Sequence, residues 1–444
     1  LKDAASGAIY GARAANGVVL VTTKHGKAGK VTVTYDGYFG VQNAITNDVK
    51  PLNAKQYMEI INKACETAGT QTYGFDSLIP VQYQQIQDGS WNGTNWLDRS
   101  LNKNAPIQSH SVNVSGGSDL SRFALGFSYF AQDGTIGKPA VPQYERYTTR
   151  INTDYSIFKK NDRDIIKIGE NATFTITNKS GLNLGGIYNN NIRNLLVTTP
   201  LLPELNSNGD YYQFDDMKAD NWDWDQTTIN PLAQIKDQHG KKNTKTHRLQ
   251  FNAFMEIEPI VGLKYRTSAG FHYYQSDYRS YVPAYNWSSD KQESRDFTEE
   301  KQGYSTNWTW ENTINYVKQI NLHSFDFLIG QSVEKWGYGS NVGAKNANSL
   351  FPNSFDHAYI DNTQGVSAEN TTISGSPNTN GALASFFGRI NYNYNETYMA
   401  SLVLRADGSA NFAEGNRWGY FPSVSAGWVI TKEDFAKPAD TDGK

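Results

Sequence analysis

Hydrophobic and polar residues alternate along most of this chain. From Val31 onward, apolar and aromatic side chains recur at every second position, and the same period returns in later segments. Successive side chains of a β-strand point to opposite faces, so each segment predicts a ribbon with one apolar and one mixed face. The pattern predicts about twelve strands, near residues 31–39, 108–116, 123–129, 145–157, 164–178, 243–258, 260–275, 300–317, 325–329, 390–394, 400–404 and 421–430.

The connectors between these strands are short and long in turn. The short ones lie at 116–118, 159–164, Pro259, 318–321 and 395–396, and the long polar ones at 44–107, 133–144, 179–242, 276–299, 337–381 and 410–420. Every long connector therefore lies at the same end of the strands, as in outer-membrane barrels with short periplasmic turns and long extracellular loops. A soluble sandwich or propeller has no reason for this arrangement. We predict an all-β chain that forms a transmembrane antiparallel β-barrel.

Two segments depart from the two-residue period. Residues 53–68 place apolar side chains at helical spacing, with Asn53 as the N-cap, which predicts a helix that packs one long loop down. Residues 6–17 are rich in Gly and Ala. No Gly-Lys-Ser or Gly-Lys-Thr sequence follows them, so we interpret this run as close backbone packing and not as a phosphate-binding loop.

Composition narrows the class of protein. The formal net charge of -3 and the pI near 6.2 exclude a basic nucleic-acid binder. Mean hydropathy is -0.61, and no apolar run approaches the roughly 18 residues of a membrane-spanning helix. A barrel strand needs only about 9–11 residues with every second one apolar, so a membrane location stays open. Aromatic residues make up 13% of the chain, which suits interfacial girdles and sugar-binding surfaces alike.

The sequence offers no set of residues for catalysis or metal binding. Its seven histidines are scattered, without the paired spacing of a zinc site, and no Gly-x-Ser-x-Gly elbow is present. Asp440 to Gly443 resembles the start of a calcium loop but has no downstream Glu, so we interpret it as a polar turn. Cys65 is the only cysteine, which excludes an intrachain disulfide framework. We expect neither an enzyme nor a bound cofactor or metal.

Four stretches resemble one family. Residues 1–42, LKDAASGAIYGARAANGVVLVTTKHGKAGKVTVTYDGYFGVQ, resemble the end of the plug domain and the first barrel strand of SusC/RagA-type TonB-dependent transporters. Residues 386–435, FFGRINYNYNETYMASLVLRADGSANFAEGNRWGYFPSVSAGWVITKEDF, resemble a mid-barrel stretch of the same family. NWTWENTINY at 307–316 and SVNVSGGSDLSRFALGFSYFAQDGTI at 111–136 also fit it. The resemblance covers the whole chain, and its first two stretches are specific because they are long and keep their order.

The resemblance implies a barrel of roughly 22 strands with a plugged lumen. Residues 1–28 would be the C-terminal end of the plug domain, and residues 29–444 the N-terminal portion of the barrel with its long extracellular loops. The chain starts without Met or a signal peptide, and no closing strand follows Ile430. We therefore expect a fragment that lacks most of the plug and the TonB-contacting segment.

The resemblance also implies active, TonB-dependent import of a nutrient across the outer membrane of a Gram-negative bacterium of Bacteroidota type. Oligosaccharides are the first expected substrate and peptides the second. The implied partners are TonB, a SusD-like surface lipoprotein that acts as a lid, membrane lipids and lipopolysaccharide, and pairs of transporter and lipoprotein can dimerise. The alternatives are a lid-free receptor for a siderophore or cobalamin and a soluble extracellular carbohydrate-binding β-protein.

One candidate substrate site lies in the connector 179–242. Its members are Tyr211, Tyr212, Trp222, Asp223, Trp224 and Asp225. In an extended segment the two tryptophans share one side and the two aspartates the other, which would present flat rings and carboxylates to a sugar. The simpler interpretation is a cluster that packs within the loop or contacts a partner protein.

A second candidate site lies on the strand near 400–404. Arg405 and Asp407 share the face opposite Leu402 and Leu404, so we expect them to point into the lumen. In the plug segment, Arg13 could pair with such a carboxylate. We interpret these three residues as a contact between plug and barrel. The aromatic residues expected in the girdles at the lipid interface are Tyr392, Tyr394, Tyr398, Trp418, Tyr420 and Trp428.

Overall fold

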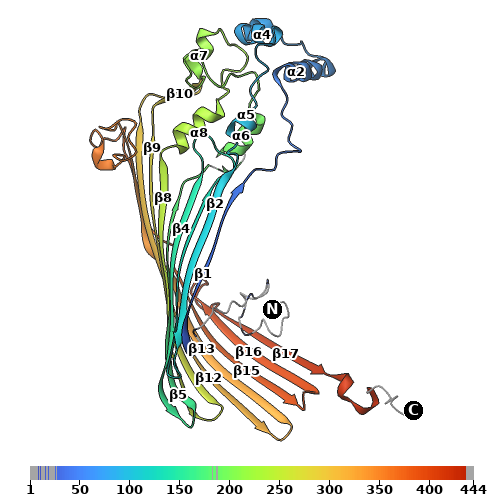
Figure 1. Ribbon diagram of the computed structural model, residues 1–444, viewed down its shortest axis with the longest axis vertical. Coiled ribbons are helices and arrows are strands. Elements are labelled where there is room, and N and C mark those ends of the chain that lie inside the picture. The colour runs from blue at the N-terminus through green and yellow to red at the C-terminus, as the bar shows by residue number, and fades with distance from the viewer. Residues whose placement is uncertain are drawn as a thin grey trace.

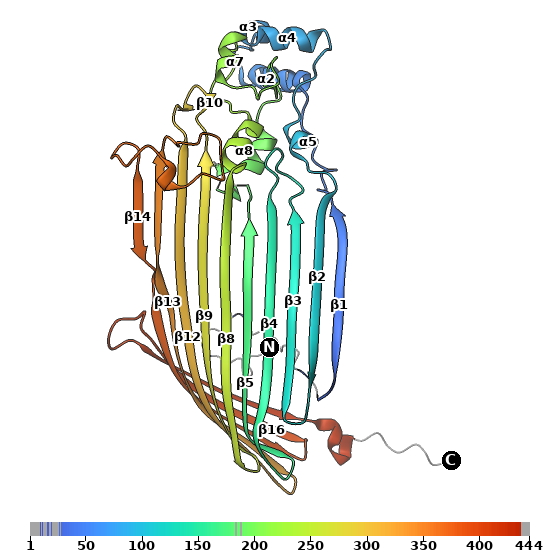
Figure 2. The same cartoon turned by 60° about the vertical axis from the view of Figure 1, so that its left-hand side comes forward.

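One antiparallel sheet, curved into a tall open trough, dominates the molecule (Figure 1). The computed structural model describes residues 28–436 except 183, 187 and 188, together with five residues nearer the N-terminus: Ile9, Gly11, Asn16, Val19 and Gly26. Arg13 and the segment 440–443 lie outside the described residues. Figure 2 shows the strands standing side by side in chain order, with the helices gathered at one end.

The main sheet has 13 strands, and β1 and β17 form its edges. Its strands are β1 (Gly29–Gln42), β2 (Ala105–Gly117), β3 (Ser121–Asp133), β4 (Gln143–Lys160), β5 (Arg163–Lys179), β8 (Lys242–Ile260), β9 (Leu263–Val282), β12 (Phe297–Ile320), β13 (His323–Ala347), β14 (Thr372–Pro377), β15 (Gly381–Tyr394), β16 (Tyr398–Ser409) and β17 (Trp418–Trp428). All the predicted strands are confirmed, and most extend further into the connectors than the period indicated.

The strand β14 was not predicted. Its sequence, TISGSP, carries a single large apolar side chain, Ile373, so it lacks the alternation that marks the other strands. It pairs with the upper half of β13, from Ser340 to Lys345, whereas β15 pairs with the lower half, from His323 to Trp336. The wall therefore divides along β13.

Tight turns join the strands at the end opposite the helices. In the β4–β5 turn, Asn161 and Asp162 both have positive φ, of 51° and 59°, and in the β15–β16 turn Asn395 and Glu396 do the same. Two-residue hairpins with positive φ at both positions match the twist of the flanking strands, and Asn and Asp tolerate that conformation. The predicted alternation of short and long connectors is thereby confirmed.

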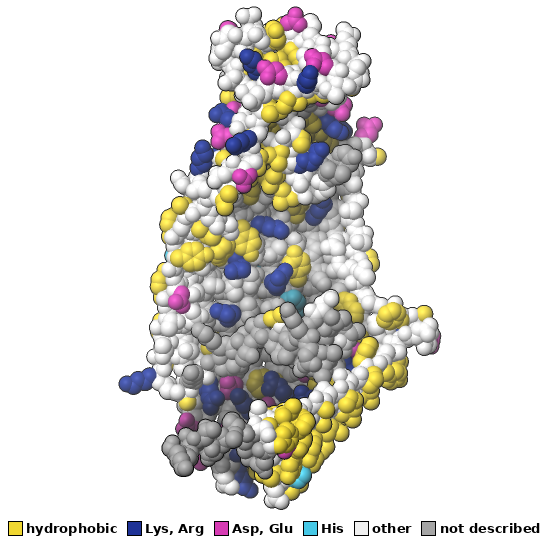
Figure 3. All heavy atoms as spheres, turned by 90° about the vertical axis from the view of Figure 1, so that its right-hand side faces the viewer, with side chains coloured by type: hydrophobic (Ala, Val, Ile, Leu, Met, Phe, Trp, Pro, Cys, Tyr) yellow, Lys and Arg dark blue, Asp and Glu magenta, His cyan; other side chains and the backbone are white. Residues whose placement is uncertain are grey.

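The outer, convex face of the sheet is apolar over a limited height. On β9 this face carries aromatic and small side chains from Tyr265 to Tyr273, and then Gln275, Asp277 and Arg279. The apolar part matches the roughly 9–11 residues of a membrane-crossing strand. Figure 3 looks onto the hollow side, where basic side chains are spread, and shows hydrophobic side chains gathered in a band along the lower edge.

Aromatic rings mark both limits of the apolar band. At its upper limit, Tyr35, His110, Tyr129 and Tyr147 follow one another across β1 to β4, with ring centroids 5.0–6.5 Å apart. At the end with the short turns, the predicted girdle residues Tyr394, Tyr398 and Trp428 stack in the same way. Such rings suit the boundary between lipid and water, where one edge is apolar and the other wet.

The long connectors fold into a helical layer at the other end. Its helices are α2 (Ala54–Ala68), α3 (Phe75–Leu78), α4 (Pro80–Gln87), α5 (Trp96–Ser100), α6 (Asn191–Val197), α7 (Phe214–Ala219) and α8 (Pro231–His239). Short elements complete the chain: β6 (Leu184–Gly185), β7 (Asn189–Asn190), β10 (Tyr285–Ser288), β11 (Lys291–Glu293), η2 (Ile360–Asn362), η3 (Ile430–Lys432) and η4 (Asp434–Ala436). None of the described helices is both long and apolar enough to cross a membrane.

The helix predicted at 53–68 is confirmed, and the capping residues Asn53 and Gly69 explain where it begins and ends. The Asn53 side chain accepts a hydrogen bond from the Gln56 amide, and the Gln56 side chain accepts one from the Asn53 amide. This reciprocal capping box satisfies two backbone donors that the helix itself cannot pair. Gly69, with φ of 69°, ends the helix in the left-handed conformation that glycine adopts at little cost.

Candidate functional site

Charged and polar side chains are concentrated on the concave, inner face of the sheet. On β16, Leu402 and Leu404 are about half exposed on the outer face, whereas Val403 and Arg405 on the inner face are 2% and 9% exposed. The strand period therefore puts Arg405 inside, as the sequence predicted. Residues paired across neighbouring strands lie on the same face, so strand register shows which other side chains are on the inner face. The residues paired in line with Arg405 are Ser156, Lys167, Glu256, Arg266, Thr313, Gly330 and Phe387.

Arg405 joins the wall to the N-terminal segment. Its Nη1 donates a hydrogen bond of 2.6 Å to the carbonyl oxygen of Ile9. Its Nε donates to Asp407 at 2.7 Å, and its Nη2 donates to the Ser385 hydroxyl at 2.9 Å. The guanidinium also lies 5.2 Å from the centre of the Phe387 ring. Each nitrogen of this buried cation has a partner, so the group is held in a single orientation.

Gly11 allows the N-terminal segment to approach this closely. Its φ is 67°, a conformation that residues with a Cβ seldom adopt. A Cβ at this position would also collide with the Asp407 carboxylate and with Arg405 Nε. The structure thus brings Arg405 and Asp407 together against Ile9 and Gly11, while the third predicted member, Arg13, is outside the described residues.

Three residues of this contact, Ser385, Ile9 and Gly11, were not predicted from the sequence. Ser385 lies opposite Asp407 in the β15–β16 register, on the polar face, so strand pairing could have found it. Ile9 contributes only its backbone carbonyl oxygen, and no sequence pattern marks a backbone acceptor. Gly11 belongs to the Gly- and Ala-rich run that was interpreted as close backbone packing, and its contact with Arg405 fits that interpretation.

A cavity of about 1030 Å³ lies beside Arg405 on the inner face. Acidic, basic and aromatic side chains line it, among them Glu311, Asp407, Arg417 and Phe421, and Val19 of the N-terminal segment reaches it as well. A cavity of this size could hold a ligand of several sugar or amino-acid units. Its mixed lining offers both charge and flat apolar surface.

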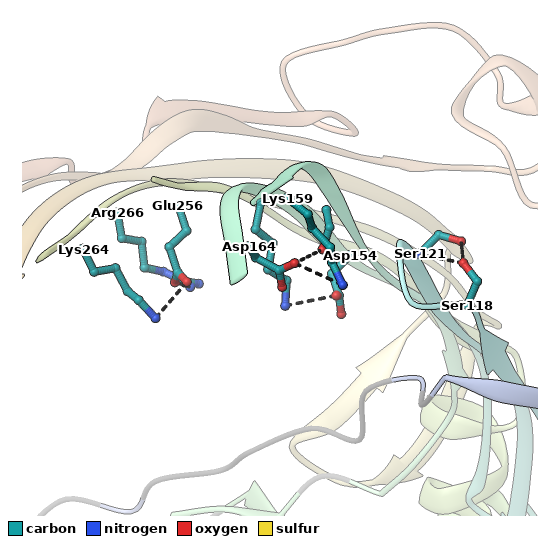
Figure 4. A network of polar contacts seen from close by, with 10 residues as sticks. Ser118, Ser121, Asp154, Lys159, Asp164, Glu256, Lys264 and Arg266 are labelled. Atoms are coloured by element: carbon teal, nitrogen blue, oxygen red, sulfur yellow. Dashed lines mark hydrogen bonds and ion pairs between the residues drawn. The ribbon is translucent and has the colours of Figure 1, made fainter. Parts of the chain in front are cut away.

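Below the cavity, charged side chains form a network near the short turns (Figure 4). The carboxylate of Asp154 accepts from Lys167 Nζ at 3.0 Å, and Glu256 accepts from Lys264 at 3.0 Å and from Arg266 at 3.2 Å. Figure 4 shows the side chains of Asp154, Glu256 and Arg266 on the same side of the curved strands. Opposite charges that alternate along the wall stabilise one another and give this end of the trough a polar floor.

The six loop residues proposed as a sugar site do not form a common surface. Tyr212 and Trp222 are 2% and 1% exposed and pack against each other. Burial and the neighbouring Asp220 carboxylate, which accepts the Tyr212 hydroxyl at 2.9 Å, raise the pKa of Tyr212. A ring without an exposed face cannot stack on a sugar, so these two residues are corrected to core positions.

The other four residues of that group are dispersed. Trp224 packs against Tyr73, with ring centroids 4.7 Å apart, and against Phe75 of the first long loop. Tyr211 lies 5.3 Å below Lys236 Nζ. Asp225 accepts hydrogen bonds from the Thr227 and Thr228 side chains, and Asp223 donates its amide to the Leu78 carbonyl. The segment is a turn and not an extended strand, so the expected alternation of Trp and Asp does not apply.

This aromatic cluster holds two distant loops together. Side chains from residues 54–96 and 195–235 share one hydrophobic core: Ala54, Met58, Phe75, Ile79, Ile86, Trp96, Leu195, Leu201, Leu202, Tyr212, Met217, Trp222, Leu232 and Ile235. A polar bond reinforces it, since Gln82 donates to the Asp220 carboxylate at 2.7 Å. The two connectors therefore form one folded layer at the end of the trough.

The described residues contain no group of three or more His, Cys, Asp or Glu side chains placed to hold a metal ion. The described residues instead offer a concave polar face, the contact of Ile9 and Gly11 with Arg405 and Asp407 on that face, and a folded layer of helices at one end of the sheet.

Known proteins share both the sequence and this architecture. No model of a protein family matches the chain. The chain is 28% identical over 441 residues to the TonB-dependent receptor P39 of Formosa agariphila, and 26% identical over 456 residues to the TonB-dependent receptor SusC of Bacteroides thetaiotaomicron. Both matches cover 98% of this chain, but only 38% and 41% of the two receptors.

Solved structures give the same fold. The RagAB peptide transporter superposes with a TM-score of 0.77 at 20% sequence identity, over 97% of this chain and 48% of that chain. The open-open state of the RagAB peptide importer gives a TM-score of 0.76 at 22% identity. In sequence and in fold together, the chain is similar to the SusC/RagA-type TonB-dependent receptors, β-barrel proteins of the outer membrane.

Proposed function

We propose that the protein imports a nutrient across the outer membrane in a TonB-dependent manner. In this proposal residues 1–28 are the end of a plug, and residues 29–444 are part of the barrel wall around it. The observation that carries the proposal is the contact between the buried Arg405 guanidinium and the Ile9 carbonyl, because it fixes an N-terminal segment inside a polar trough.

The strength of that contact suits a plug that must be held and then released. A hydrogen bond from a charged donor contributes about 1.5–3 kcal/mol. One such bond keeps the segment in place against thermal motion, yet a pull on the plug can break it without unfolding the wall. The outer membrane has no ATP of its own, so the work of opening would come from the TonB complex of the inner membrane.

The substrate proposal covers oligosaccharides and peptides. Burial of Tyr212 and Trp222 removes the loop feature that had favoured sugars. The cavity beside Arg405 presents both carboxylates and a guanidinium, Glu311, Asp407 and Arg417, next to the Phe421 ring. Peptides carry both charges and apolar side chains, so this lining supports a peptide substrate, and RagAB, whose fold the chain shares, is named a peptide transporter.

A SusD-like surface lipoprotein is the proposed lid. The layer formed by α2 to α8 covers the end of the trough that would face outwards (Figures 1 and 2). A preformed layer offers a lid a defined surface, which separate flexible loops would not. Pairs of transporter and lipoprotein are the proposed assembly.

Native purification tests the proposal. The full-length protein, tagged in its host and extracted from the outer membrane in mild detergent, should bring down a surface lipoprotein and a trapped ligand, identified by mass spectrometry. Deleting the gene, or tonB, should abolish growth on that ligand while growth on monomeric nutrients continues. Unchanged growth of either deletion strain, or recovery of the protein in the soluble fraction, would contradict it.

A further inference from the structure

Three exposed arginines form a group on the inner face of the wall: Arg146 and Arg150 on β4 and Arg248 on β8. We refer to them as the arginine patch. Arg248 pairs with Thr175, and Thr175 pairs with Thr148, which lies midway between Arg146 and Arg150. With about 3.3 Å per residue along a strand and about 4.8 Å between strands, the three Cα atoms lie about 10–13 Å apart. Figure 3 shows basic side chains spread over this hollow face.

The arginine patch lacks acidic partners. Other basic side chains of the inner face are paired, Lys167 with Asp154 at 3.0 Å and Arg389 with Asp326 at 3.0 Å. No carboxylate of the described residues pairs with the patch, and the inward positions that adjoin it on β3, β4, β5, β8 and β9 hold no Asp or Glu. Positive charges gathered in a concave surface without counter-charges attract anions.

Aromatic rings orient two of the three guanidinium groups. That of Arg146 lies 5.5 Å from the centre of the Phe130 ring, and that of Arg248 lies 5.3 Å from the centre of the Tyr274 ring. A guanidinium that stacks on a ring uses its flat face, so the N–H donors at its edge stay free for an oxygen ligand. Threonine hydroxyls lie between the arginines and add further donors.

The arginine patch lies between the helical layer and the recorded contacts of the N-terminal segment. Gly26 lies against the backbone of Phe123, which pairs with Thr153, and Thr153 is nearer the short turns than Arg150. The contact at Arg405 is nearer still to the short turns. In the proposed orientation a substrate enters from the helical layer, so it meets the arginine patch first.

We propose that the arginine patch binds the acidic side chains of an extended peptide substrate as it enters. The inference rests on the proposed import function and narrows its substrate to acidic peptides. In an extended peptide, side chains four residues apart point the same way and lie about 13 Å apart, as Arg146 and Arg150 do. A guanidinium binds a carboxylate through two parallel N–H···O bonds. The rings of Phe130 and Tyr274 are stacked with arginines and offer a sugar no free platform, which favours a peptide over an anionic oligosaccharide.

Peptide binding to the purified full-length protein tests this proposal. The probe is a fluorescently labelled peptide with two glutamates four residues apart, compared by fluorescence anisotropy with the same peptide carrying glutamines. The glutamate peptide should bind about tenfold more tightly, and its affinity should fall as the salt concentration rises. The R146Q/R150Q variant should lose that preference. Lys245→Gln, an exposed position on the outer face of β8, is the matched control and should keep it.

Three outcomes would overturn the proposal. These are equal affinity for the two peptides, an unchanged preference in R146Q/R150Q, and tighter binding of oligogalacturonate than of the glutamate peptide. If the double variant fails to insert, Arg248→Gln alone answers the same question, and it should weaken binding of the glutamate peptide about tenfold. These affinities need no TonB. A protein that binds the glutamate peptide without supporting growth on any ligand would refute the import function and leave the binding site standing.

Discussion

At the scale of single residues, Arg405 shows how a buried charge can act as a fastener. A buried cation without partners costs several kcal/mol, so its three hydrogen-bond partners are a condition for its presence. Two of them, Asp407 and Ser385, belong to the wall, and the third is the carbonyl of Ile9. Asp407 and Ser385 thus hold the guanidinium in place, and the Ile9 carbonyl accepts its remaining hydrogen bond.

Replacing Arg405 by Met should loosen the N-terminal segment while the side-chain volume is kept. We expect Arg405→Met in the full-length protein to make the host several-fold more sensitive to large antibiotics such as vancomycin, measured as minimum inhibitory concentration. Arg389→Met is the matched control, because Arg389 pairs with Asp326 within the wall at 3.0 Å. Equal sensitivity of the two variants, at equal abundance, would contradict a fastening role.

The pH dependence of the loop layer should depend on His239. Burial lowers the pKa of His239 to about 4, and its Nε2–H donates to Asn191 at 2.7 Å. The unfolded layer binds a proton below pH 6.5 and the folded layer does not, so stability is complete above that value and falls as the pH drops toward 4. The loss is about 3 kcal/mol at most.

Hydrogen exchange of residues 230–240 as a function of pH measures this effect. Protection in the wild type should decrease between pH 6.5 and pH 4, whereas His239→Gln, which cannot take up a proton, should give a flatter profile. A wild-type profile as flat as that of the variant would exclude His239 as the source.

The direction of side chains on strands could be predicted from the sequence, whereas that of side chains in turns could not. The period of two placed Arg405 and Asp407 on the inner face because strand geometry fixes the direction of each side chain. The same reasoning failed for Trp222, because the residues after α7 form a turn and not a strand. The Trp222 ring packs in a core that includes side chains from the other long loop. The Ile9 contact joins residues nearly 400 positions apart through a backbone atom, which no local pattern encodes.

At the scale of elements, two connectors cooperate to form one folded layer. Side chains of both connectors meet in a single core, and together they bury Trp96, Leu201, Tyr212 and Trp222. The sequence predicted α2 from its period and its N-cap, but it could not show that the partner of α2 would come from a loop more than one hundred residues later. Long-range packing decides the arrangement of these short helices.

Removing the cap of α2 should destabilise this layer. Asn53→Ala deletes an acceptor in the capping box and should cost about 0.5–2 kcal/mol. We expect faster cleavage within residues 43–104 by a low concentration of protease on intact cells. Asp48→Ala, an exposed position in the same connector, should leave the rate unchanged. Equal rates for both variants would show that the cap does not limit opening of the layer.

At the scale of the whole molecule, the wall is taller than the membrane. The longest strand, β13, has 25 residues, which at about 3.3 Å per residue span about 80 Å. A hydrocarbon core is about 30 Å thick, so more than half of this strand lies outside it. The change from apolar to polar side chains on the outer face of β9 agrees with that division.

Two neighbouring residues of β13 provide a test of the membrane-facing side. Ile329, 60% exposed on the outer face, should not tolerate a charge, since Lys near the bilayer midplane costs about 2–4 kcal/mol in such barrels. Ile329→Lys should reduce the amount of protein in the outer membrane, measured by immunoblot. Leu328→Lys, one residue away on the inner face, should be tolerated. The reverse order of the two variants would invert our assignment of inside and outside.

The division of the wall along β13 has a mechanical meaning. Below Trp336, β13 and β15 are zipped together, whereas above it β14 occupies the bonding edge of β13. In its upper part, β13 has no hydrogen bonds to β15, whereas in its lower part the two strands are paired continuously. Strain applied to the upper part of β13 is therefore not passed directly to β15, whereas strain applied below Trp336 is passed to β15 through their shared hydrogen bonds.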